Sequence, residues 1–227
     1  MVFQPIVELA DDSVYAQEAL VRCSWPEYEQ PPVLFDDAAH WNCSGQLGRM
    51  IREIAVPMCP GQRLFVNVHP TELDESFLVH PDDPIFAHDH EVYVELTEAV
   101  PVADVDRCSA VLKELRARAG IKVAIDDFGA GYSNLRILAD LQPDIVKLDR
   151  GMIQGISTNL RQQQLATWIV RLCHDLGARV VAEGVETRDD LMAVRDTGLS
   201  YAQGFFLGRP EALRSSSGVN RVPLRAR

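Results

Sequence analysis

Two adjacent carboxylates, Asp126 and Asp127, stand at the end of an apolar run in the stretch AIDDFGAGYSNL, residues 124–135. Two glycines follow them, and a helix is predicted to begin directly behind. Neighbouring carboxylates suit a metal site, and a glycine-containing turn before a helix suits a phosphate loop. The same letters also suit an acidic turn with no chemical role.

A phosphate loop explains this stretch less well than a metal site does. The letters GAGYSN partly match the dinucleotide fingerprint, but the third glycine is missing and the stretch follows the fifth expected strand instead of the first. The letters DFG also occur in protein kinases, yet the chain has no H-R-D loop and no Gly-rich loop before a V-A-I-K strand.

Further polar residues stand at the ends of other expected strands, which meet at one face of a (β/α)8 barrel. They are Glu18, Asn67, Glu95 with Glu98, Lys147 with Asp149, and Glu183 with Glu186, and Gln203 stands near the start of the last expected strand. Each has an ordinary explanation when taken alone: Lys147 could be a buried ion-pair partner of Asp126, and the glycines at 129 and 131 could serve only a turn. Such separate explanations do not account for the shared position at one end of successive strands.

Five or more carboxylates at one barrel mouth would repel one another strongly. Burial and like charge would each raise their pKa values, and one or two divalent cations would relieve the repulsion. Because all the ligand atoms would be oxygens, Mg²⁺, Mn²⁺ or Ca²⁺ is favoured over zinc. Two ions about 4 Å apart with a bridging carboxylate suit the transfer of a phosphoryl group to water. Lys147 would then orient that water or neutralise a phosphate oxygen.

Strand-like and helix-like patterns alternate along the chain. Strands are expected at residues 3–9, 15–23, 63–68, 91–96, 121–128, 144–150, 179–185 and 201–207. Helices are expected at residues 45–58, 103–119, 133–141, 159–176 and 188–196. Segment 24–44 is rich in Pro, Asp and Glu and fits no element.

Eight strands, most of them separated by helices, predict an α/β fold, a modified (β/α)8 TIM-type barrel. The first link, residues 10–14, is too short for a parallel crossover, so we expect an antiparallel first strand. The barrel should occupy residues 1–210. The Ser- and Arg-rich residues 211–227 should form a loosely held C-terminal tail.

The composition excludes several classes of protein. Of 227 residues, 47% are apolar, and 22 basic against 33 acidic residues give a net charge of −11, which argues against a DNA-binding protein. The five cysteines are scattered without a C-x-x-C pair, so neither a disulfide framework nor a zinc knuckle is expected. No apolar run reaches the roughly 18 residues of a membrane helix, and no signal-peptide pattern opens the chain. We expect a cytoplasmic protein, or the cytoplasmic domain of a larger one.

Eight short motifs follow one another along the chain. They are FQPIV (3–7), EALVR (18–22), NVHP (67–70), ELTE (95–98), DDFGAGYSNL (126–135), KLDR (147–150), AEGVET (182–187) and QGFFLGRP (203–210). In this order they resemble the EAL-domain family of cyclic-di-GMP phosphodiesterases. The resemblance implies a barrel with an antiparallel first strand and hydrolysis of cyclic-di-GMP to linear 5′-pGpG. It also implies two ions of Mg²⁺ or Mn²⁺, with Ca²⁺ inhibitory.

The resemblance further assigns roles to single residues. The metal ligands would be Glu18, Asn67, Glu95, Asp126, Asp127 and Glu183, with Asp126 as the bridge. The catalytic groups would be Glu18, Asp127, Lys147 and Glu186, of which Lys147 and Asp127 hold the attacking water. The substrate contacts would be Gln4, Arg22, Gln203 and Pro210, with Arg22 on a phosphate. Glu98 would anchor the loop that contains Gly131, which in the family couples dimer contacts to metal binding.

Two departures from the family pattern concern the edge of the barrel and not the catalytic positions. Segment 24–44 is shorter and less typical than usual, and His69 stands where Ser or Thr is common. A catalytically inactive cyclic-di-GMP receptor is the alternative function, and an interaction domain whose output is dimerisation is a third. Because family members commonly pair through helices beside the loop after the fifth strand, a homodimer is expected, and fusion to sensor or regulatory domains is a further expectation.

Overall fold

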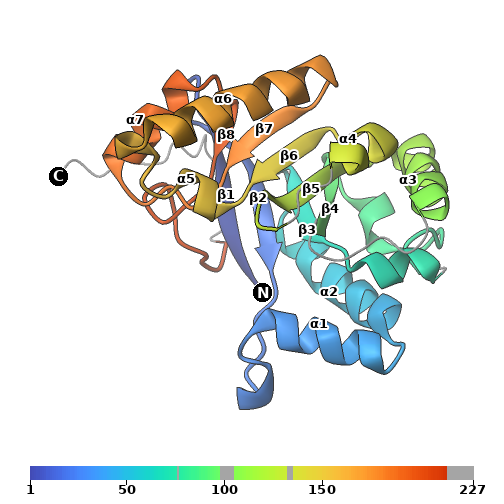
Figure 1. Ribbon diagram of the computed structural model, residues 1–227. Helices are drawn as coiled ribbons and strands as arrows, with labels where there is room; N and C mark the ends of the chain where they lie inside the picture. Colours follow the sequence, from blue (N-terminus) through green and yellow to red (C-terminus); the bar gives the residue numbers. More distant parts are fainter. Residues whose placement is uncertain (76, 98–104, 132–134, 214–227) are drawn as a thin grey trace.

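Eight strands close into a barrel, and helices pack around its outside (Figure 1). The computed structural model describes residues 1–75, 77–97, 105–131 and 135–213. The strands are β1 (Val2–Glu8), β2 (Val14–Leu20), β3 (Leu64–Asn67), β4 (Val92–Thr97), β5 (Lys122–Phe128), β6 (Ile145–Leu148), β7 (Arg179–Ala182) and β8 (Tyr201–Ala202). The α-helices are α1 (Pro31–His40), α2 (Ser44–Met58), α3 (Val105–Ala119), α4 (Leu135–Leu141), α5 (Arg150–Ile153), α6 (Leu160–Asp175) and α7 (Arg188–Asp196). Four 3₁₀ turns complete the described elements: η1 (Pro26–Tyr28), η2 (Pro70–Asp74), η3 (Pro84–Ala87) and η4 (Ile156–Thr158). No helix in these ranges is both long and apolar enough to cross a membrane.

Strand β1 runs in the direction opposite to the other seven described strands. It pairs antiparallel with both β2 and β8, whereas β2 to β8 pair in parallel. The link to β2 is a tight turn in which the Glu8 amide donates to the Ser13 carbonyl at 2.9 Å and Asp12 takes a φ of 60°. So short a turn can only reverse the chain. The modified (β/α)8 barrel with an antiparallel first strand is thereby confirmed.

Alternate residues of the strands build both the barrel interior and its polar mouth. The packed interior consists of Ile6, Tyr15, Ala16, Phe65, Tyr93, Ala124, Ile145, Val181 and Tyr201. In or directly after each of the seven parallel strands, a polar residue follows one interior residue by two positions. These polar residues are Glu18, Asn67, Glu95, Asp126, Lys147, Glu183 and Gln203. On the reversed β1 the polar residue, Gln4, comes two residues before Ile6. Residues two apart share one face of a strand, so all eight polar residues share the interior face at one end of the barrel.

Aromatic rings and a guanidinium fill the opposite end of the barrel. Tyr15 stacks on Tyr201 with 4.1 Å between ring centroids, and Phe65 stacks on Tyr93 at 4.2 Å. The Arg179 guanidinium lies over the rings of Tyr15 and Tyr201 and donates to the Tyr15 hydroxyl at 2.9 Å. Because these polar atoms are paired inside a packed layer, the barrel is a core and not a pore.

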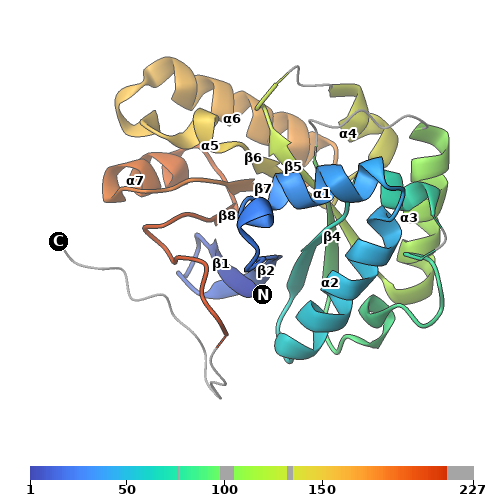
Figure 2. The ribbon, with the colours of Figure 1, turned by 90° about the horizontal axis from the view of Figure 1, so that it is seen from below.

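Segment 24–44, which fits no element in the sequence, contains η1 and α1. Helix α1 begins at Pro31 and Pro32, and proline is well tolerated in the first helical turn because the amides there have no partner within the helix. The segment borders the barrel mouth, since α1 residues line the same cavity as Glu18 and Asp126. Figure 2 shows this arm of the chain, in blue, beside the barrel.

The last strand is shorter than the predicted 201–207 and ends at Ala202. Residues 205–207 form a turn instead. A Cβ atom at Gly204 would lie 2.2 Å from the Val185 carbonyl oxygen, so only glycine allows the chain to pass this close to the segment after β7. Gln203 therefore lies just beyond β8 and not within a long strand.

The first residues after the barrel are attached to it. Phe3 and Glu211 exchange two backbone hydrogen bonds, of 2.7 and 2.9 Å. Residues 214–227 lie outside the described part of the chain, so a loosely held tail at 211–227 stays a prediction.

A buried network of charges joins α2 to the segment between β3 and β4. Arg52 donates to Glu72 and to Asp83, each at 2.8 Å, and these three side chains are at most 1% exposed. Helix α2 approaches closely because residue 48 is glycine: a Cβ there would lie 1.9 Å from Glu72 Oε2. Removing the cation would leave two buried carboxylates without their counter-charge.

We predict that Arg52→Met lowers the free energy of unfolding by about 3–5 kcal/mol, because both buried carboxylates lose their partner. Urea denaturation followed by circular dichroism measures the change. Arg49→Met is the matched control on the same helix, since Arg49 pairs with the exposed Glu53 and Asp82 and its loss should leave the midpoint almost unchanged. Equal effects of the two substitutions would contradict a structural role of the Arg52 network.

Candidate functional site

Lys147 lies at the centre of the barrel mouth, where its side chain is 1% exposed. Its ammonium nitrogen Nζ faces four carboxylates that come from β2, β4, β5 and the end of β7. The distances are 3.3 Å to Glu18 Oε2, 2.8 Å to Glu95 Oε1, 3.0 Å to Asp126 Oδ1 and 2.8 Å to Glu183 Oε1. One positive charge therefore faces four acids in a site largely closed to water.

Burial and charge act in opposite directions on Lys147. Burial alone would lower the pKa of its ammonium, but the neighbouring carboxylates, Asp126 and Glu18 first, raise that pKa well above the ordinary value. The carboxylates are affected the other way: burial, and then the charge of Glu18, raise the pKa of Glu95 well above its usual range. The mouth thus keeps Lys147 charged while opposing full ionisation of the acids around it.

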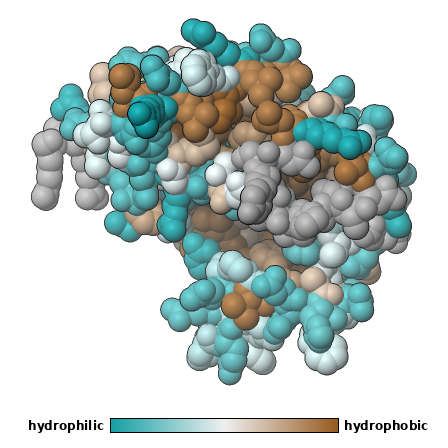
Figure 3. All heavy atoms as spheres, viewed as in Figure 1, coloured by the Kyte–Doolittle hydropathy of each residue, from teal (hydrophilic) through white to brown (hydrophobic). Residues whose placement is uncertain are grey.

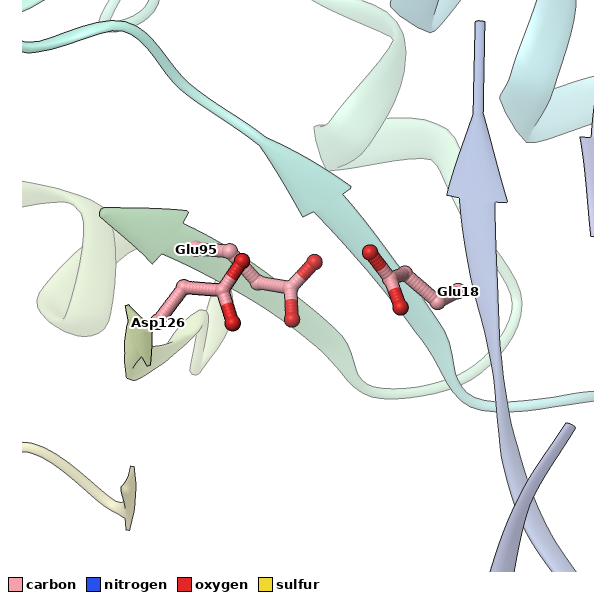
Figure 4. Close-up of side chains that lie close together, drawn as sticks. All are labelled: Glu18, Glu95 and Asp126. Atoms are coloured by element: carbon pink, nitrogen blue, oxygen red, sulfur yellow. The ribbon is translucent and has the colours of Figure 1, made fainter. Parts of the chain in front are cut away.

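Two groups of carboxylates at the mouth share one residue. Ligand oxygens of Glu18, Glu95 and Asp126 lie within 4.8 Å of one another, and so do those of Asp126, Asp127 and Glu183. Figure 4 shows the carboxylates of the first group converging from three strands. Because Asp126 belongs to both groups, its carboxylate is placed where a bridge between two cations would stand.

Asp127 reaches the mouth through a local irregularity of β5. Simple alternation would turn it to the opposite face from Asp126. The register between β5 and β6 shifts between Ile125 and Phe128, and Asp127 takes a φ of 54°, in the left-handed region that few non-glycine residues adopt. The strand predicted over residues 121–128 agrees with β5, which ends at Phe128, and the bulge within it turns the Asp127 side chain to the mouth.

The second group also carries raised pKa values. Burial, and then the charge of Asp126, raise the pKa of Asp127 to about 6. Burial raises the pKa of Glu183 to about 8, with Lys147 opposing the shift. A cation bound between these groups would favour their charged forms and so displace a proton that Glu183 holds near neutral pH.

The residues at the mouth fit divalent cations. Glu95 Oε2 and Gln203 Oε1 are buried and have no hydrogen-bond partner among the described residues. Buried polar atoms are normally paired, so such oxygens indicate a missing partner. Carboxylate and amide oxygens are the ligands that Mg²⁺, Mn²⁺ and Ca²⁺ accept. Two amides steady the first group: Asn67 Nδ2 donates to Glu18 Oε1 at 3.4 Å, and Gln203 Nε2 donates to Glu18 Oε2 at 2.6 Å.

Two cavities open at the mouth and share Glu18, Leu20, Asp126 and Asp127. The first, of about 430 Å³, extends toward α1 and is lined largely by apolar side chains. The second, of about 300 Å³, extends toward the segments that follow β6, β7 and β8. Together they offer room on both sides of the carboxylates, in the size range of small-ligand sites.

The structure brings together most of the residues that the sequence singled out. Those that meet at the mouth are Glu18, Asn67, Glu95, Asp126, Asp127, Lys147, Glu183 and Gln203. Gln4 and Glu186 line the second cavity and Arg22 the first. The roles assigned to these residues stay predictions.

Four of the predicted residues are held by other contacts or lie apart. Glu186 accepts a hydrogen bond from Gln154 at 3.0 Å, Gln4 donates to the Gly208 carbonyl at 3.0 Å, and the exposed Arg22 donates to the carbonyl of its own neighbour Val21. Pro210 is half-buried and lines neither cavity.

The predicted loop anchor cannot be placed, because Glu98 lies outside the described residues. Gly131, which the same prediction includes, is exposed, and a Cβ atom added there would meet open space.

Sequence reasoning missed the residues that form the wall of the first cavity. Pro31, Pro32, Phe35 and Asp36 come from α1, within the segment that fits no element in the sequence. His69 lines the same cavity, and burial lowers the pKa of its imidazole. The departure at position 69 was the one signal available; nothing in the pattern of 24–44 indicated a cavity wall.

A barrel with one reversed strand and an acidic, lysine-centred mouth defines the class of protein to which this chain belongs. The chain matches the EAL domain over residues 1–210. It is 31% identical, over 92% of its length, to a Pseudomonas aeruginosa protein named cyclic di-GMP phosphodiesterase NbdA. It is 32% identical, over 91% of its length, to an uncharacterised protein of Azorhizobium caulinodans. The chain spans only 28% and 30% of the lengths of these two relatives.

Solved structures give the same result. The chain superposes on Klebsiella pneumoniae BlrP1, solved as a manganese and cyclic-di-GMP complex, with a TM-score of 0.73 and 32% identity, over 92% of this chain and 55% of that one. It superposes on the PaMucR phosphodiesterase, solved with c-di-GMP, with a TM-score of 0.80 and 27% identity, over 92% and 90% of the two chains. The chain belongs to the EAL domain family. The comparisons support cyclic-di-GMP hydrolysis at the level of that family.

We predict that Mn²⁺ raises the melting temperature, because a cation that binds only the folded mouth stabilises it by mass action. Asp126→Asn should lose most of that rise, since it removes the one ligand shared by both groups. Glu186→Gln is the matched control, because Glu186 belongs to neither group and should keep the rise. Differential scanning fluorimetry across a Mn²⁺ series gives the measurement; an undiminished rise in Asp126→Asn would count against a metal site at this position.

Proposed function

We propose that this chain hydrolyses one phosphodiester bond of cyclic-di-GMP and releases linear 5′-pGpG, with two Mg²⁺ or Mn²⁺ ions at the barrel mouth. The observation that carries the proposal is the arrangement of two carboxylate groups that share Asp126 around the buried ammonium of Lys147. Membership of the EAL domain family and the two cavities beside these groups support it.

Bound ions would supply Lewis acidity toward a phosphate oxygen and lower the pKa of a bound water. Their ligands would be Glu18, Asn67, Glu95, Asp126, Asp127 and Glu183. Gln203 fixes Glu18 through its 2.6 Å hydrogen bond, which limits the rotation of that carboxylate. The closed barrel holds these side chains at the ends of β2, β3, β4, β5 and β7, so their relative positions should change little as the substrate enters.

Lys147 would act on the attacking water. Its Nζ lies within 3.3 Å of carboxylates from both groups, so it occupies the space between them. An ammonium there can donate a hydrogen bond to a water oxygen while Asp127 accepts from the same water, which sets its direction of attack. Arg22, exposed at the rim of the first cavity, is within the part of the mouth where a phosphate would pass and can neutralise its charge.

The chain should convert cyclic-di-GMP to pGpG with Mg²⁺ or Mn²⁺, and Ca²⁺ should not support the conversion. Lys147→Met should lower kcat by roughly 10²–10³, the range typical of a lost preorganised hydrogen-bond donor. Lys122→Met is the matched control, because Lys122 pairs with Asp144 at 3.4 Å at the start of β5, the end of the barrel away from the mouth. Chromatography of the nucleotide products, with melting temperatures as a check on folding, gives the readout.

A purified chain that never forms pGpG with either ion would overturn the proposal. Tight binding of cyclic-di-GMP without turnover would instead identify a receptor.

We further propose that the chain forms a homodimer through α4 and α6. Helix α4 follows the loop after β5, and both helices expose apolar side chains: Leu135 is 55% exposed, Leu165 47% and Trp168 65%. Figure 3 shows apolar side chains gathered over α6 on an otherwise mostly hydrophilic face. Trp168→Asp should shift the sedimentation equilibrium toward the monomer. Met192→Asp is the control: Met192 lies on α7 and is 53% exposed, and its substitution should leave the equilibrium unchanged.

A further inference from the structure

The first cavity has the size and the lining chemistry of a site for an aromatic base. It begins at the carboxylates of Glu18 and Asp126 and ends against α1, with a volume of about 430 Å³. Apolar side chains form much of its lining: Leu20, Pro31, Pro32, Phe35 and Ile51. Stacking on proline and phenylalanine rings does not select one base over another, because every base has a π-face.

Two polar side chains in the same cavity have free hydrogen-bonding capacity. The exposed Asp36 carboxylate forms no hydrogen bond or ion pair with another described residue, and its charge acts on the nearby His69 imidazole. His69 accepts at Nδ1 from the Thr71 backbone N–H at 3.3 Å, and its Nδ1 lies 2.7 Å from the Thr71 hydroxyl. Because Nδ1 accepts, the ring proton is on Nε2, which has no hydrogen-bond partner in the described part of the chain.

These two groups offer an acceptor and a donor, and guanine offers their complements. Its N1–H and 2-amino group donate on one edge, while O6 and N7 accept. A carboxylate matches the two donors, and an imidazole N–H matches O6 or N7. Adenine would set its N1 acceptor against the carboxylate and its 6-amino donor against the imidazole N–H.

The negative charge of the mouth also favours a base with hydrogen-bond donors beside Asp36. A phosphodiester that approaches Glu18, Asp126 and Asp127 already meets an acidic surface, so one more unpaired carboxylate would hinder it unless that carboxylate met a donor. Asp36 lies on α1 with Pro31, Pro32 and Phe35, whose apolar surfaces suit a base better than a phosphate. When the Asp36 carboxylate accepts hydrogen bonds from the guanine N1–H and 2-amino group, its negative charge has a partner.

We propose that the first cavity receives one base of the substrate and that Asp36 and His69 make it selective for guanine. This inference rests on the proposed function and adds specificity residues to it. Asp36 acts on the edge that carries the 2-amino group, and His69 acts on the side of O6.

The test compares cyclic-di-GMP with cyclic-di-IMP, whose bases keep O6 but lack the 2-amino group. Asp36→Ala should reduce the preference for cyclic-di-GMP by roughly tenfold, the effect of one hydrogen bond to a charged group. His69→Leu should lower kcat/KM for both substrates by a similar factor, and His69→Gln, which retains a donor, should restore most of the loss. Asp37→Asn is the control on α1, since Asp37 instead accepts from the Tyr28 hydroxyl at 3.1 Å.

Binding measured with Ca²⁺ in place of Mg²⁺ repeats the comparison without turnover, so it applies even to an inactive chain. An unchanged preference in Asp36→Ala together with unchanged kcat/KM in His69→Leu, in a wild-type chain that forms pGpG, would overturn this inference and leave the proposed function intact. A wild-type chain that neither binds nor converts cyclic-di-GMP would overturn both.

Discussion

The ion cluster around Lys147 is the interaction on which the site depends. One buried ammonium faces four carboxylates at 2.8–3.3 Å, and all of them are held on different strands of a closed sheet. Without the lysine the acids would repel one another in a poorly solvated space; with it, they still carry an excess of negative charge that a divalent cation can balance. The same cluster thus holds the mouth together and leaves it with capacity for cations.

Much of this arrangement could be predicted from the sequence because it follows from the two-residue alternation of side chains along a strand. An apolar residue inside the barrel and a polar residue two positions later recur from Ala16 and Glu18 on β2 to Tyr201 and Gln203 at β8. Once the strands are recognised, alternation alone brings these polar residues to one end. The five-residue first link likewise settles the direction of β1, because the length of a connection limits which strands it can join.

The rest could not be predicted because it depends on contacts between distant residues. Asp127 reaches the mouth through a bulge that exists only in the pairing of β5 with β6. The sequence alone predicts Arg52 to be an ordinary surface residue of a helix. In the structure η2 and the residue before η3 bring Glu72 and Asp83 against it. Helix α1 has no clear apolar period in the sequence, and its role as a wall appears only where it faces β2 and His69 across a cavity.

The reversed direction of β1 has a consequence for how the chain can be joined to other domains. In a regular barrel the first strand starts at the end away from the site, but here Val2 pairs with Leu20, at the mouth end of β2. The chain also leaves at this rim, since Glu211 pairs with Phe3. A domain linked ahead of β1 would therefore join the barrel beside the cavities, and its position could widen or obstruct the entrance without a signal having to cross the barrel.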